Sequence, residues 1–102
     1  MLYDELELAI GVMAAMVRKD MRISATDPAS RARTILIALD ANLDHQAGGD
    51  VAGALSRVYR SMRRKLDEAV SNNDEPALLE LLDGVQNVSA AWQQLREQQS
   101  MQ

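Results

Sequence analysis

The stretch EPALLELLDGVQNVSAAWQQLREQ, residues 75–98, decides the fold class of this chain. Its apolar side chains alternate at spacings of three and four residues, which places them on one face of an α-helix. Asp74 directly precedes the stretch, and its carboxylate suits the N-cap of a helix. The stretch therefore predicts a helix with one face turned toward a core. The residues of that face are Leu78, Leu81, Val85, Val88, Trp92 and Leu95.

Three upstream segments carry the same helical period and are separated by short breaks. Pro28 follows Thr26 and Asp27, and proline suits the first turn of a helix because no backbone donor is needed there. Gly48 and Gly49 end the next periodic segment, since glycine adopts a left-handed conformation at little cost. The predicted helices cover about residues 2–23, 28–47, 51–72 and 75–98.

The short breaks between these segments predict the architecture. Connections of a few residues place consecutive helices side by side and antiparallel. No segment alternates apolar and polar residues with the period of a β-strand. The sequence therefore predicts an all-α fold, an antiparallel up-down-up-down four-helix bundle, with residues 1–102 forming a single domain.

The composition of the chain argues against several classes of function. The 102 residues carry a formal net charge of −4, which disfavours binding to the phosphates of DNA or RNA. Cysteine is absent, as is common in a reducing compartment, and the acidic start is unlike a signal peptide. No stretch approaches the ~20 apolar residues that cross a bilayer. We expect a cytoplasmic protein that binds no nucleic acid and does not insert into membranes.

The sequence contains no recognisable catalytic motif. It has no glycine-rich phosphate loop, nucleophile elbow or zinc motif. His45 is the single histidine and stands near a predicted helix end, where the helix dipole favours a cation. A phosphotransfer domain built around His45 is an alternative, but that role calls for a histidine in the middle of a helix. We expect no enzyme activity, no cofactor and no bound metal.

The third predicted helix is locally basic. We interpret these cations as a solvated face stabilised by ion pairs along the helix. Arg63 is spaced to pair with Asp67, and Arg64 is spaced to pair with Glu68. A surface for phosphate or nucleic acid is the alternative, and such a face would also suit an acidic protein partner. The cations are Arg57, Arg60, Arg63, Arg64 and Lys65.

Short motifs stand in a fixed order along the predicted helices. They are Met1-Leu2-Tyr3-Asp4, Gly48-Gly49-Asp50-Val51-Ala52, Tyr59-x-x-Met62-x-Arg64-x-Leu66, Asn73-Asp74 and Ala91-Trp92. Their order and spacing resemble the FliS-type flagellar export chaperones over nearly the whole chain. Glu5 departs from that pattern, because the family usually has glycine at this place.

The resemblance implies a function that composition alone does not indicate. It implies an ATP-independent cytoplasmic chaperone that binds the C-terminal segment of unassembled flagellin, prevents premature polymerisation and delivers flagellin for flagellar type III export. It also implies docking to the export gate through an N-terminal arm, which in the family precedes the Leu-Tyr-Asp motif where this chain starts. The alternative is a structural or regulatory bundle that self-associates, for example as a homodimer, without a flagellin client.

Candidate flagellin-binding residues lie in or near the matching motifs, at the margins of the apolar rows. An amphipathic client would lay its apolar side chains into grooves between helices. Leu2 and Leu6 join the set because they are expected to be exposed where the arm is absent. The full set is Leu2, Tyr3, Leu6, Ile10, Ile35, Tyr59 and Leu66.

Overall fold

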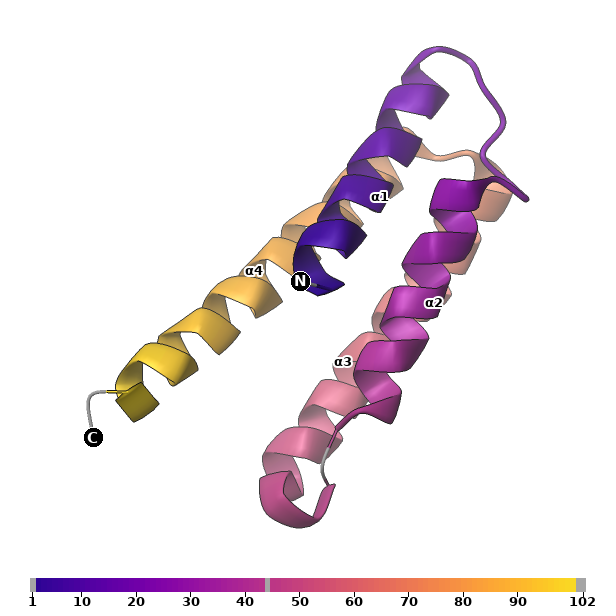
Figure 1. Cartoon of the computed structure of the whole chain (residues 1–102). Coiled ribbons are helices and arrows are strands. Elements are labelled where there is room, and N and C mark those ends of the chain that lie inside the picture. The colour runs from indigo at the N-terminus through magenta and orange to yellow at the C-terminus, as the bar shows by residue number, and fades with distance from the viewer. Residues whose placement is uncertain (1, 44, 101–102) are drawn as a thin grey trace.

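Four helices run alternately up and down the long axis of the molecule in the computed structural model (Figure 1). The structure describes residues 2–43 and 45–100, with side chains for all of these except residues 45, 47, 48 and 92–100. The helices are α1 (Leu2–Arg18), α2 (Asp27–Ala41), α3 (His45–Asn72) and α4 (Glu75–Ser100). This arrangement confirms the predicted all-α four-helix bundle. None of the helices, over the residues described, is long and apolar enough to cross a membrane.

The four helices share one apolar core. α1 packs against α2 and α4, and α2 packs against α3, while the contact between α3 and α4 is the least extensive of the neighbouring pairs. Apolar side chains from all four helices supply the buried core. The largest fully buried side chains are Leu6, Ile10, Met13, Ile23, Leu36, Leu66, Leu78 and Val85.

α1 ends at Arg18, five residues before the predicted end at Ile23. Asp20 adopts a left-handed conformation with φ of 60°. The backbone N–H of Met21 then donates to the Met16 carbonyl at 2.9 Å, and that of Asp20 donates to the Val17 carbonyl at 2.9 Å. This pair of bonds is a Schellman turn, which satisfies carbonyls at a helix end. The helix stops here although the apolar period continues.

A second Schellman turn ends α3 at the same end of the bundle, and the two turns are linked. Asn73 has φ of 51°, and the N–H of Asp74 donates to the Ala69 carbonyl at 3.0 Å. The Asn73 side chain accepts from the Ile23 N–H at 3.0 Å and donates to the Met21 carbonyl at 3.0 Å. We call this the interlocked end. It holds Ile23 fully buried in a loop rather than in a helix.

The connection between α2 and α3 also differs from the prediction. α2 ends at Ala41 rather than near residue 47, and the N–H of Asn42 donates back to the Ala38 carbonyl. Residues 45–48 already belong to α3, which is kinked at Gly49 with φ of 51° and ψ of −124°. Gly49 therefore interrupts the helix where the sequence predicted a break, but a short helical segment over residues 45–48 comes before it instead of the end of α2. Only glycine adopts that backbone conformation at low cost.

Candidate functional site

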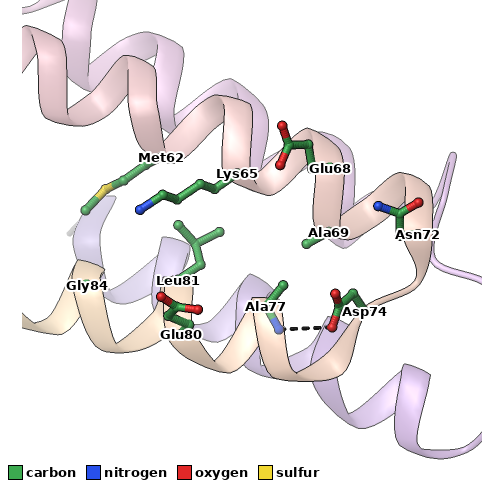
Figure 2. A pocket seen from close by; sticks show the side chains of 10 residues that line it. All are labelled: Met62, Lys65, Glu68, Ala69, Asn72, Asp74, Ala77, Glu80, Leu81 and Gly84. Carbon is green, nitrogen blue, oxygen red and sulfur yellow. Dashed lines mark hydrogen bonds between the residues drawn. The ribbon is translucent and has the colours of Figure 1, made fainter.

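A groove lies between α3 and α4, the pair of neighbouring helices that pack least closely (Figure 2). It has a volume of about 280 Å³. Met62 and Ala69 line it from α3, and Leu81 and Gly84 line it from α4. Lys65, Glu68 and Glu80 surround this apolar floor with charge. Such a groove suits a chain segment with an apolar edge and polar flanks.

Small residues on α4 leave space for this groove. A Cβ added at Gly84 would lie 3.7 Å from the Met62 Cε, an ordinary van der Waals distance. Gly84 therefore presents bare backbone to the groove opposite a methionine, whose flexible side chain adapts to different shapes. Nearer the interlocked end, Asp74 caps α4 by accepting from the Ala77 N–H at 3.1 Å. This bond confirms the N-cap predicted for Asp74.

Apolar surface continues from the groove along α3. Val51 is 59% exposed and Val58 is 36% exposed. A shallow hollow of about 400 Å³ beside Val58 is lined by both apolar and basic residues. Its lining is Ala54, Arg57, Val58, Ser61, Met62 and Lys65. α3 therefore presents an exposed apolar strip (Val51, Ala54 and Val58) on one side of its length, and the buried Met62 lies at the end of this strip, beside Val58.

The seven residues expected to contact flagellin divide into two groups in the structure. Leu2 is 38% exposed, and Tyr3 is half-buried with its hydroxyl hydrogen-bonded to that of Tyr59 across the bundle. The remaining five are buried in the core: Leu6, Ile10, Ile35, Tyr59 and Leu66. As client contacts all seven stay a prediction. Because these five side chains are buried, a client would reach them only if the bundle opened.

Sequence reasoning did not identify the groove itself. Leu81 was placed on an apolar row and Met62 in a motif of the third helix, but the helical period does not reveal which side of a helix faces a loosely packed neighbour. Gly84 carried the usable signal, since glycine inside a helical pattern often marks a close approach or a site. The side chains of His45 and Trp92, which the sequence analysis also discussed, lie outside those that the structure describes.

A polar contact joins α3 to α2, on the side of α3 that faces α2 rather than α4. The Ser56 hydroxyl donates to Asp40 at 2.6 Å, and the Arg60 Nε lies 3.5 Å from the other Asp40 oxygen. The bond from Ser56, with further help from Arg60 and Arg63, lowers the pKa of the Asp40 carboxyl below its ordinary value. Asp40 is therefore ionised at neutral pH and balances part of the positive charge on α3.

The predicted ion pairs within the basic segment of α3 are wrong. Asp67 pairs instead with Arg33 of α2, at 3.7 Å. Among the described residues, neither Arg63 nor Arg64 forms an ion pair. The physical reason is that the seam between α2 and α3 brings a second guanidinium to Asp67, which competes with its neighbour on the same helix.

The arrangement defines a small all-helical bundle with a partly apolar groove between two of its helices. The residues that the structure describes contain no cluster of three or more side chains able to hold a metal ion. The family model of the flagellar protein FliS matches residues 1–99. This chain belongs to the FliS family, the flagellar secretion chaperones.

A curated relative supports the same family. The flagellar secretion chaperone FliS of Salmonella typhimurium (strain LT2) is 29% identical over 99 residues. The matched region covers 90% of this chain and 73% of the relative. The match confirms the resemblance read from the order of the motifs.

Proposed function

We propose that this protein is an ATP-independent chaperone that binds the C-terminal segment of unassembled flagellin, prevents its premature polymerisation and delivers it for flagellar type III export. The observation that carries the proposal is the groove between α3 and α4, with its floor of Met62, Ala69, Leu81 and Gly84. Membership of the secretion chaperone family supports the same function. The protein would act in the cytoplasm, before export.

Such a function depends on replacing the apolar contacts that flagellin makes in the filament with apolar contacts to the chaperone. A flagellin segment that packs in the filament exposes apolar side chains when it is unassembled. Burial of those side chains in the groove contributes roughly 25 cal/mol for each Å² removed from water. Ordering the segment costs part of that free energy, which keeps the client releasable. No nucleotide is needed for this exchange, and the sequence carries no nucleotide-binding loop.

Further contacts fall into two groups. Leu2 and Tyr3 reach the surface and would contact the client directly. The buried members of the predicted set, Leu6, Ile10, Ile35, Tyr59 and Leu66, would contact it only if the bundle opened. Docking to the export gate remains part of the proposal through family membership, and a homodimer is the alternative use of the exposed apolar strip.

Gly84 offers a direct test of the groove. Gly84→Leu would project a large side chain into the groove toward Met62, whereas Gly84→Ala adds one methyl at an ordinary contact distance. In calorimetric titration with a peptide of the flagellin C-terminal region, we expect Gly84→Leu to weaken binding at least ~10-fold, or ~1.4 kcal/mol. Gly84→Ala should bind like the unmodified chain. Circular dichroism checks that both variants keep their helices.

The titration separates the proposal from its alternatives. Equal binding by Gly84→Leu and Gly84→Ala would place the client elsewhere on the bundle. Absence of binding by the unmodified chain, together with a mass that rises with concentration, would instead support a self-associating bundle without a flagellin client. A negative heat-capacity change on binding is expected, because apolar surface is buried.

A further inference from the structure

The side of α3 that faces α2 carries a concentration of arginines that the groove does not use. A hollow of about 660 Å³ runs along this seam. We call it the basic face. Its lining includes five arginines and only two carboxylates, in a chain whose formal net charge is −4. The lining residues are Arg33, Arg57, Arg60, Ser61, Arg63, Arg64, Asp67 and Glu68.

Some of this positive charge is already balanced within the fold, but much is not. Arg60 lies 3.5 Å from Asp40, and Arg33 lies 3.7 Å from Asp67. In the described part of the chain, Arg57, Arg63 and Arg64 have no ion-pair partner. Arg57 and Arg64 are also exposed. Two fully available guanidinium groups therefore stand two helical turns apart, with the half-buried Arg63 near the second.

The basic face adjoins the exposed apolar strip. Arg57 and Ser61 line both the basic face and the shallow hollow that contains Ala54, Val58 and Met62. A segment lying along α3 would thus meet arginines on one edge and aliphatic side chains on the other. Lys65 extends the positive charge along the apolar edge. The surface matches a ligand that is both acidic and partly apolar.

We propose that the basic face is a docking surface for an acidic, amphipathic segment of a protein partner, used in addition to any flagellin contact. Guanidinium groups bind carboxylates through paired, charge-assisted hydrogen bonds. Glutamates two turns apart on a partner helix would meet Arg57 and Arg64, while its apolar side chains cover Val58. The positive charge of the basic face favours a protein segment that carries carboxylates.

A nucleic acid fits the surface less well than an acidic protein segment. The remainder of the chain is acidic, so a long polyanion would meet repulsion beyond the basic face. A short protein segment ends before it reaches that acidic surface.

The test is an NMR titration of the full, isotope-labelled chain with a synthetic helical peptide that carries glutamates on one edge and leucines on the adjacent edge. We expect chemical-shift changes in the amides of residues 54–65, and a loss of at least ~10-fold in affinity for Arg57→Glu with Arg64→Glu. The matched control is Lys19→Glu with Arg22→Glu. It makes the same change in net charge at exposed positions beside the interlocked end, which lack ion-pair partners among the described residues.

Three outcomes would overturn the proposal. The first is the absence of localised shifts on addition of the peptide. The second is equal weakening by the control pair, which would show attraction to overall charge only. The third is equally tight binding of a single-stranded RNA at the same face, which would assign a general polyanion surface. Titration of the Arg57→Glu and Arg64→Glu variant with the flagellin peptide reports separately on the proposed chaperone function.

Discussion

Asn73 combines a backbone requirement with two side-chain bonds. Its φ of 51° is a conformation that few residues other than glycine, asparagine and aspartate adopt readily. Its amide accepts from Ile23 and donates to Met21. Glycine would supply the backbone conformation without the bonds, and aspartate would supply an acceptor without a donor. Asparagine meets all three demands at the place where two turns cross.

We expect Asn73→Gly to lower the free energy of unfolding by roughly 1–3 kcal/mol, because the Ile23 N–H and Met21 carbonyl lose their protein partner. Urea denaturation followed by circular dichroism measures this change. Asp20→Gly is the matched control. Asp20 also has a positive φ, of 60°, but its side chain is exposed and bonds to none of the described residues, so its replacement should be neutral or slightly stabilising. Equal effects of the two substitutions would show that the Asn73 bonds contribute nothing.

Gly49 and Gly53 of α3 have similar surroundings but different backbone conformations. Gly49 sits at the kink with φ of 51° and ψ of −124°, whereas Gly53 lies in regular helix one turn later. A Cβ at either position would meet no atom within 4 Å. Differences between substitutions at the two positions therefore report backbone conformation rather than packing.

We expect Gly49→Ala to destabilise the protein by roughly 1–3 kcal/mol, since a Cβ is strained in that conformation. Gly53→Ala should stabilise it by roughly 0.5–1 kcal/mol, because alanine loses less conformational entropy than glycine in a helix. Thermal unfolding of the two variants measures the contrast. If Gly49→Ala were also stabilising, the kink would not be a feature of the folded protein in solution.

The existence and order of the helices could be predicted because the apolar period repeats over whole segments. Their ends could not, because α1 stops where Asp20 turns left-handed while the period continues to Ile23. At α2 the helix ends at Ala41, and the apolar Leu43 follows outside it. In both places a local turn ends the helix although apolar residues continue beyond it.

The candidate site was predictable only in part, for a related reason. The helical period identifies which side chains face a neighbouring helix, but it does not give the distance between the two helices. Ile10 and Leu66 were therefore expected at the margins of the apolar rows, whereas the structure buries both in the core. The groove at Met62 and Gly84 depends on how far α4 stands from α3, which is a property of the assembled bundle.

At the scale of the whole molecule, client binding can use the surface or can require the bundle to open. The groove and the apolar strip are accessible in the closed bundle, whereas five predicted contacts are buried. These two modes differ in what they do to the core. Surface docking leaves the core amides protected, while opening exposes them to solvent.

We expect hydrogen exchange at the amides of Ile10 and Leu66 to stay unchanged or to slow when the flagellin C-terminal peptide is added. Binding to the folded state alone stabilises that state by mass action. Mass spectrometry of deuterium uptake with and without peptide measures the effect, with the Gly84→Leu variant as the control that should show no change. Faster exchange at these positions would instead support direct contact of the client with the buried set.

The interlocked end also has a consequence for the order of events in folding. Its two side-chain bonds join positions 50 and 52 residues apart, whereas hydrogen bonds within a helix join residues four apart. Helices form in roughly 0.1–1 μs, but contacts between distant segments wait for the chain to close a long loop. We therefore expect the helices to form before the bonds of Asn73, and we expect those bonds to act chiefly on the rate of unfolding. On this view, loss of the Asn73 side chain would speed unfolding more than it would slow folding.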